Sequence, residues 1–187
     1  MRTLAVAIVI ALAVHAVVEG VDVRVEHDKA FNFRPIMTWG WNPDGAGDVR
    51  MARTQEDDAA VAKKRFEPTI MDAVATEMTR RGLKQAAAAP DLLVTYFVLL
   101  STNMSTQTVG QFLPATLAWG LPPFAPATQS MQVMNQGSLV LDLSANKVVV
   151  WRGVAQAKVD FGIDDKKRDA LVREAVRDLL KRYPPKS

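Results

Sequence analysis

Alternating hydrophobic and polar positions between residues 137 and 153 predict a β-hairpin. Three leucines occupy every second position of its first half: Leu139, Leu141 and Leu143. A period of two places them on one face of a strand. The run 148–151 holds three valines and a tryptophan, which suit a central strand covered on both faces. The linking residues 144–147 are turn formers, and Asn146 tolerates a left-handed backbone.

Four further segments are expected to form strands. Residues 21–26 alternate valine with charged residues, which predicts a half-exposed strand. A short strand is expected at 36–39, because Pro35 favours a strand start or a sheet edge. The nearly continuous apolar run 92–100 predicts a buried central strand. Residues 129–135 alternate and are expected to enter the sheet ahead of the hairpin.

Two amphipathic helices complete the expected elements. The first has Pro68 in its first turn and Gly82 at its C-terminal cap, and the charged, alanine-rich residues 55–66 are a candidate helical lead-in to it. Its apolar stripe consists of Ile70, Met71, Val74 and Met78. Asp164 or Asp165 is expected to cap the second helix, which ends before Pro184. The stripe of that helix consists of Leu171, Val172, Ala175, Val176, Leu179 and Leu180.

The order of these elements predicts an α+β fold. Hairpin-linked strands with two amphipathic helices favour a two-layer sandwich, in which a mainly antiparallel sheet carries both helices packed on one face. Residues 42–48 are rich in glycine, asparagine and aspartate and are expected to form a surface turn. Their spacing matches neither the EF-hand nor the P-loop pattern. We expect one domain over residues 21–187.

The N-terminal residues 1–20 have the features of a secretory signal peptide. A basic start precedes an apolar run of about fifteen residues, and cleavage is expected near Ala16 or Gly20. The run is shorter than the roughly 20 residues that span a bilayer, so an uncleaved anchor is the less favoured alternative. We therefore expect a periplasmic or cell-envelope protein, soluble or peripheral. The chain has no cysteine, so its stability must come from a hydrophobic core of one domain.

An uncharged stretch is the most unusual feature of the composition. Residues 92–141 contain no Asp, Glu, Lys or Arg, and the part at about 101–130 is rich in proline and expected to be an irregular apolar loop. Two interpretations stay open: the loop covers an end of the sheet, or it contacts a partner. On the second, the partner-binding residues are Phe112, Leu117, Trp119, Leu121 and Phe124.

No catalytic constellation is evident. His27 is the sole histidine after the expected leader, which argues against zinc-type sites and a Ser-His-Asp triad. Asp91 and Asp142 flank apolar strands and are candidates for a hydrolytic or ligand site, but strand-end caps or solvent-facing side chains are the simpler interpretation. For Arg152, three roles stay open: binding an anion, stacking on the Trp151 indole, or forming an ion pair with a neighbouring strand. We expect no catalytic residue, no cofactor, no metal and no nucleic-acid partner.

Several short motifs are spread along the chain: Thr38-Trp39, Arg81-Gly82-Leu83, the segment 90–94, the segment 137–143 and Val150-Trp151-Arg152-Gly153. They resemble the motifs of the domain-of-unknown-function family 4136, a group of envelope lipoprotein-like proteins. The resemblance implies a fold and an envelope location, and it carries no activity. Many members of that family have a lipid-modified cysteine, which this chain lacks.

Two functional hypotheses follow. The first is a non-enzymatic binding or scaffolding module of the cell envelope, with an envelope protein or a membrane surface as partner of the loop around residues 112–124. The second is a small-ligand-binding protein or hydrolase with a site near His27, Asp91 or Asp142, which requires a concave pocket that gathers these groups.

Overall fold

The computed structural model describes residues 21–52, 59–101, 136–158 and 164–185. These residues form a mixed seven-stranded sheet and two helices. The elements in chain order are β1 (Asp22–His27), β2 (Thr38–Trp41), β3 (Gly47–Ala52), α1 (Ala59–Arg80), β4 (Lys84–Gln85), β5 (Leu92–Ser101), β6 (Gln136–Ala145), β7 (Val148–Lys158) and α4 (Asp165–Leu180). The α+β class predicted from the sequence is therefore confirmed.

The sheet is mixed, so the prediction of a mainly antiparallel sheet was wrong. Its strand order is β1-β7-β6-β5-β2-β4, and β3 also pairs with β5. The pairs β1/β7, β7/β6 and β6/β5 are antiparallel, whereas β2/β5, β3/β5 and β2/β4 are parallel. The parallel pairs arise because α1 returns the chain to the end of the sheet at which β2 and β3 began.

One edge of the sheet is built from an interrupted strand. β2 pairs with the first residues of β5, and β3 continues along the rest of it. The turn predicted at 42–48 is this interruption, but it ends earlier than expected because β3 already begins at Gly47. A Cβ atom at Gly47 would lie 2.4 Å from ring and carbonyl atoms of Tyr96. Glycine therefore allows the edge strand to lie under the Tyr96 ring.

The predicted hairpin is formed by β6 and β7. Its two turn residues, Asn146 and Lys147, both have positive φ, at 51° and 65°, the backbone that a two-residue hairpin turn requires. A bulge lies between Leu143 and Ser144. At Gly153, a Cβ atom would come within 2.6 Å of the Trp151 indole and 2.7 Å of Leu179. Glycine at this position therefore lets α4 pack closely against the sheet.

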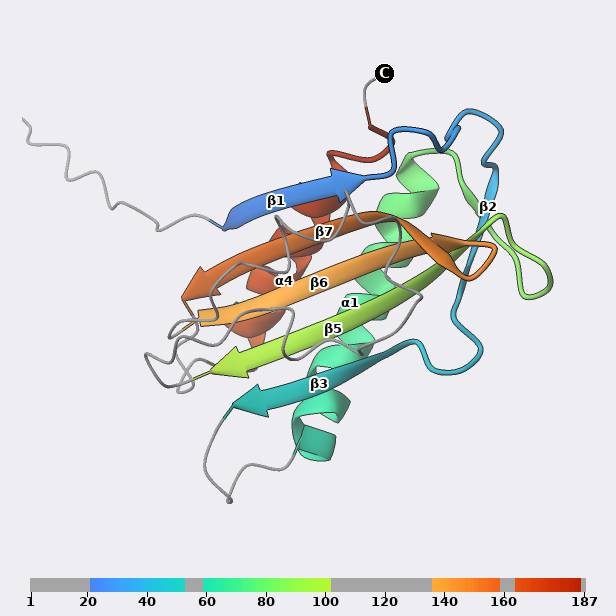
Figure 1. The fold of residues 1–187 in the computed structure, drawn as a ribbon. Helices are drawn as coiled ribbons and strands as arrows, with labels where there is room; N and C mark the ends of the chain where they lie inside the picture. Colours follow the sequence, from blue (N-terminus) through green and yellow to red (C-terminus); the bar gives the residue numbers. More distant parts are fainter. Residues whose placement is uncertain (1–20, 53–58, 102–135, 159–163, 186–187) are drawn as a thin grey trace, which may run out of the picture.

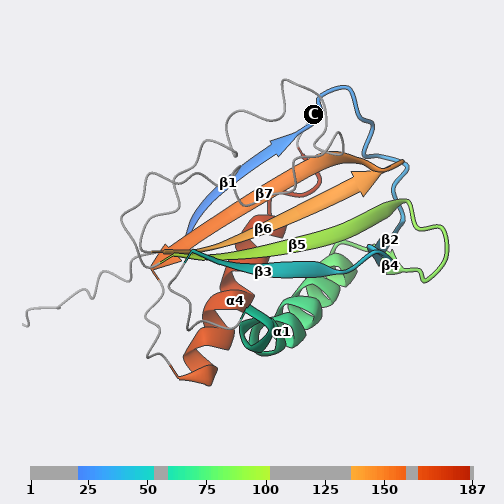
Figure 2. The ribbon, with the colours of Figure 1, turned by 60° about the horizontal axis from the view of Figure 1, so that its bottom comes forward.

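Both helices lie on the same face of the sheet (Figure 1, Figure 2). Asp164 caps α4, and its carboxylate accepts a hydrogen bond from the Lys167 N–H at 2.9 Å. Pro68 lies inside α1 rather than in its first turn. That prediction was wrong because contacts made by the preceding residues extend the helix: Lys63 Nζ donates to the Gly47 carbonyl at 2.7 Å, and Phe66 packs against the core.

The main core lies between the helices and the sheet. Its largest fully buried apolar and aromatic side chains include Trp39, Trp151, Tyr96, Ile70 and Met78. Arg81 joins the two helices at their C-terminal ends, where it donates to the Leu180 carbonyl at 2.6 Å and to the Glu77 carboxylate at 2.7 Å. Within the described ranges, no helix is both long and apolar enough to cross a bilayer.

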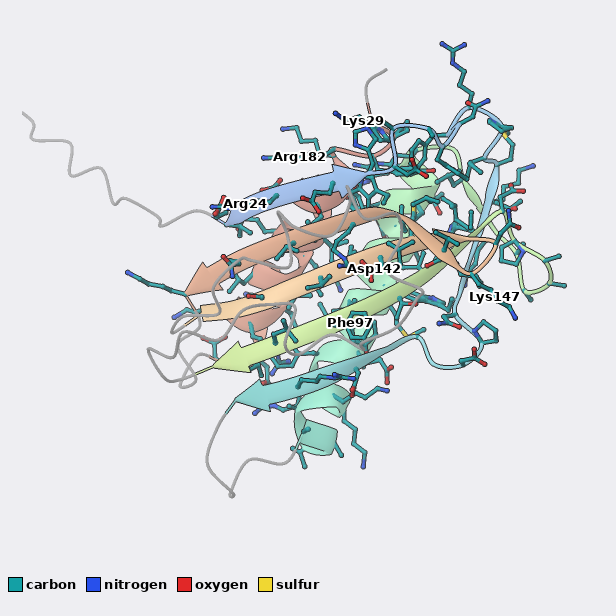
Figure 3. The ribbon with its side chains drawn as sticks, viewed as in Figure 1. Arg24, Lys29, Phe97, Asp142, Lys147 and Arg182 are labelled. Atoms are coloured by element: carbon teal, nitrogen blue, oxygen red, sulfur yellow. The ribbon has the colours of Figure 1, made fainter. Side chains whose placement is uncertain are left out.

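The opposite face of the sheet is also buried, and we call it the helix-free face. Its members are Phe97, Leu99, Ser138, Val140, Asp142, Arg152, Val154 and Gln156, and they are 0–8% exposed. Register places them together, because Phe97 pairs with Val140, and Val140 in turn pairs with Val154. Figure 3 shows Phe97 and Asp142 on the side turned away from the helices. The two-layer arrangement therefore stays a prediction.

Candidate functional site

The candidate partner-binding residues lie outside the described residues. These are Phe112, Leu117, Trp119, Leu121 and Phe124. Their role in contacting a partner stays a prediction, and so does the signal peptide at 1–20. The candidate polar residues can be placed, and each of them has a structural partner.

Asp91 links the start of β5 to the start of β2 through hydrogen bonds. Its Oδ2 accepts hydrogen bonds from the Met37 N–H at 3.0 Å, the Thr38 N–H at 2.8 Å and the Thr38 hydroxyl at 2.8 Å. The Asp91 N–H donates back to Thr38 Oγ1 at 3.0 Å. These bonds, led by that from Met37, lower the pKa of Asp91. The strand-end cap expected from the sequence is confirmed, and the carboxylate is held as an acceptor.

Asp142 forms a buried ion pair with Arg152 in the centre of the helix-free face. Arg152 Nε and Nη2 donate to its two oxygens at 2.7 and 2.8 Å. Burial raises the pKa of Asp142 and lowers that of Arg152, and the pairing opposes both shifts. The interpretation of Asp142 as strand-end or solvent-facing was wrong, because it sits mid-strand on a second buried face. The ion pair expected for Arg152 is confirmed.

His27 faces the helix side of the sheet, opposite to Asp142. It pairs in register with Trp151, and its ring lies edge-on to Phe33 with centroids 6.2 Å apart. A pocket of about 210 Å³ is lined by His27 and by the neighbouring segments 28–34 and 184–185. Neither Asp91 nor Asp142 is among its described lining residues. The structure therefore does not bring the three candidate polar residues together in that pocket.

An apolar pocket of about 60 Å³ lies between the helices and the sheet. It adjoins the edge of the sheet where β5 ends and β6 begins, since Leu100 and Gly137 contribute to its wall. Its described side chains are almost wholly apolar and come from both helices and four strand ends: Val21, Phe66, Ile70, Val98, Leu100, Leu139, Ala155, Ala157, Leu171, Val172 and Ala175. This lining suits an apolar group and offers it few polar contacts.

Arg168 is the charged side chain in the described lining of this pocket. Its guanidinium lies 5.7 Å from the centre of the Phe66 ring and pairs with Asp165 and Asp169, the latter at 2.8 Å. Hydrogen bonds from Arg65 and then from Arg168 lower the pKa of Asp165. Because two carboxylates neutralise Arg168, the wall near it attracts an anionic ligand only weakly.

Two residues that line this pocket were predicted from the sequence, but as part of a helix core. Leu171 and Val172 belong to the predicted apolar stripe of α4, but they are only half-buried because they line the pocket instead of filling the core. The sequence signal was the apolar stripe itself, which includes Leu171 and Val172. The stacking of Arg168 on Phe66 joins two helices far apart in sequence, and no local pattern indicates it.

The remaining polar groups of the described ranges supply no metal centre. No cluster of three or more His, Cys, Asp or Glu side chains that could hold an ion occurs among these residues. Two buried indole nitrogens, in Trp39 and Trp151, have no hydrogen-bond partner among the described residues. Neither residue is among the described lining of the apolar pocket or of the pocket beside His27.

Solved structures with the same fold have low sequence identity to the chain. A DUF4136 family protein from Bacteroides thetaiotaomicron superposes with a TM-score of 0.52 at 18% identity, covering 88% of this chain and 96% of that one. A PDZ domain protein from Parabacteroides distasonis superposes with a TM-score of 0.52 at 15% identity. The match covers 90% of this chain and only 37% of the PDZ protein.

The sequence matches a protein family, although it matches no curated protein. The family described as "Domain of unknown function (DUF4136)" matches residues 23–185, nearly all of the chain beyond the expected leader. The resemblance found in the short sequence motifs is thereby confirmed, and the chain belongs to the DUF4136 family.

Proposed function

We propose that the protein is an exported, non-enzymatic binding or scaffolding module of the cell envelope, and that the apolar pocket is its binding site. The observation that carries this proposal is the described lining, in which apolar side chains of α1, α4 and the strand ends surround the space. The ligand class that fits is an apolar group of an envelope partner, because burial of hydrocarbon supplies binding free energy without polar contacts.

The state of the polar candidates supports a binding role over hydrolysis. A hydrolytic carboxylate must be available to a substrate or to water. Asp91 instead accepts three hydrogen bonds from the start of β2, and Asp142 is paired with Arg152 away from the pocket. The described pocket wall offers neither of these carboxylates to a bound group.

The proposed location rests on the N-terminal sequence. A basic start, an apolar run and small residues near Ala16 and Gly20 suit export. In a chain without cysteine, stability in an oxidising compartment depends on the core alone. Fractionation of cells that express the full chain tests this part: the mature protein is expected in the envelope fraction, and a leader-bearing protein in the cytosol would contradict it.

The binding role is tested by photo-crosslinking in cells from the pocket rim. The probe is Leu171→p-azidophenylalanine, and the control is the same residue at Ala170, which is exposed on the same helix. We expect an identified envelope component to be captured from position 171 and not from 170. Capture should fall at least several-fold when Ala175→Phe fills the pocket. Equal capture at both positions, or capture that is unaffected by Ala175→Phe, would rule out the pocket as the binding site.

A further inference from the structure

We infer that the helix-free face is the docking surface for the chain's own uncharged segment, residues 102–135. This face is as well buried as the main core, although both helices pack on the other side of the sheet (Figure 2). Leu99, Val140 and Val154 are each 0% exposed. A flat sheet face without a cover would leave such side chains largely open to water.

The cover must come from the same chain. The exposed fractions are those of one chain by itself, so the burial of this face is produced without a second chain. Residues 53–58 join β3 to α1, and residues 159–163 join β7 to α4. Both connections are short and lead to helices on the opposite side of the sheet. Residues 1–20 precede β1, which is an edge strand.

Segment 102–135 has the right attachment points and the right reach. It joins the end of β5 to the start of β6, and these adjacent strands form the middle of the face. β5 has ten residues, so it is about 33 Å long. A chain of this length can run along the face and return, since each residue adds up to roughly 3.5 Å.

The helix-free face and the segment are complementary in polarity and charge. The face is apolar except for Ser138, Gln156 and one ion pair, and Asp142 and Arg152 satisfy most of each other's charge through two hydrogen bonds. A cover that brought a further charge would have to bury it without a partner, which is costly. The segment contains no Asp, Glu, Lys or Arg. Its Phe112, Trp119 and Phe124 supply apolar area, and its many Ser, Thr and Gln residues can hydrogen-bond the polar atoms.

The inference goes beyond the proposed function and is independent of the pocket. It favours packing of the uncharged segment against its own chain over contact with a partner, and it places the segment on a face of the sheet instead of at its end, as a third layer of the fold. Contact of the segment with a partner is the competing outcome.

Adjacent residues of β5 provide a matched pair of probe positions. Phe97 points to the helix-free face, whereas Tyr96 points to the helices and donates a hydrogen bond from its hydroxyl to Glu67 at 2.9 Å. The variants are Phe97→p-azidophenylalanine and Tyr96→p-azidophenylalanine in the purified full chain. Cleavage at methionine separates fragment 79–104, which carries both probes, from fragments 52–71 and 105–131.

The expected result is a crosslink from position 97 to fragment 105–131 and from position 96 to fragment 52–71. Capture of fragment 105–131 should be at least several-fold stronger from 97 than from 96. Three results would overturn the inference: capture from 97 of the N-terminal fragment, capture of a second copy of the chain, and capture only of cross-strand neighbours. The Tyr96 probe shows in the same experiment whether the chain has folded.

Discussion

Asp142 and Arg152 lie directly opposite each other on β6 and β7, and the guanidinium holds both carboxylate oxygens at 2.7 and 2.8 Å. Neither side chain is more than 4% exposed. A charge pair at this depth stabilises a fold only while both members are present, because a lone buried charge has neither water nor a partner.

Removing one member of this pair should therefore lower the free energy of unfolding more than removing both. We expect Asp142→Ala to lower the free energy of unfolding by about 3–5 kcal/mol. The double variant Asp142→Leu with Arg152→Met should lose clearly less, because it leaves no unpaired charge. Urea unfolding monitored by tryptophan fluorescence measures the loss of stability in the single and the double variant. A single variant that costs under about 1 kcal/mol would show that water reaches the pair.

Gly153 is the position where a single methyl group should disturb the contact between α4 and the sheet. A Cβ atom there would meet Trp151 at 2.6 Å and Leu179 at 2.7 Å. We expect Gly153→Ala to destabilise the protein by about 1–3 kcal/mol, as overpacking does. In a double-mutant cycle, Leu179→Ala should recover part of the loss by removing the obstructing group. Additive effects of the two changes would contradict the steric explanation.

The hydrogen bonds to Asp91 predict a specific dependence of stability on pH. They lower its pKa in the folded protein below the ordinary value of 3.8, so its contribution is present above that value and is lost as pH falls through the folded-state pKa. Asp91→Asn should be less stable than wild type at pH 7. The difference should shrink as pH falls below about 4. Urea midpoints of both proteins between pH 3 and 7 measure it, and a difference that grows on acidification would refute the assignment.

The hairpin shows what the sequence alone can predict. Alternating leucines, the valine run and Asn146 are local signals, and all of them led to the correct strands and turn. β3 carries a similar local signal, since Val49 and Met51 alternate with Asp48 and Arg50, but it is missing from the expected strands. Its pairing with β5 could not be predicted in that way, since periodicity does not specify whether neighbouring strands run parallel.

The candidate site was harder to predict, for two physical reasons. Asp142 alternates with leucines, so the sequence pattern resembles that of a half-exposed strand, whereas the second face of this strand is buried as well. The apolar pocket depends on how α1, α4 and the strand ends approach one another. A helix stripe indicates that Leu171 faces inward, but it does not indicate whether a neighbour fills the space beside it.

Methyl NMR of the purified chain under xenon pressure tests whether the apolar pocket takes up an apolar group. Xenon enters dry apolar cavities and needs no polar contact. We expect saturable shifts of the Leu171, Val172 and Ala175 methyl signals, no comparable change at Val140 and Val154, and loss of the response in Ala175→Phe. Unchanged signals at the three pocket residues, or equal shifts on the helix-free face, would contradict it.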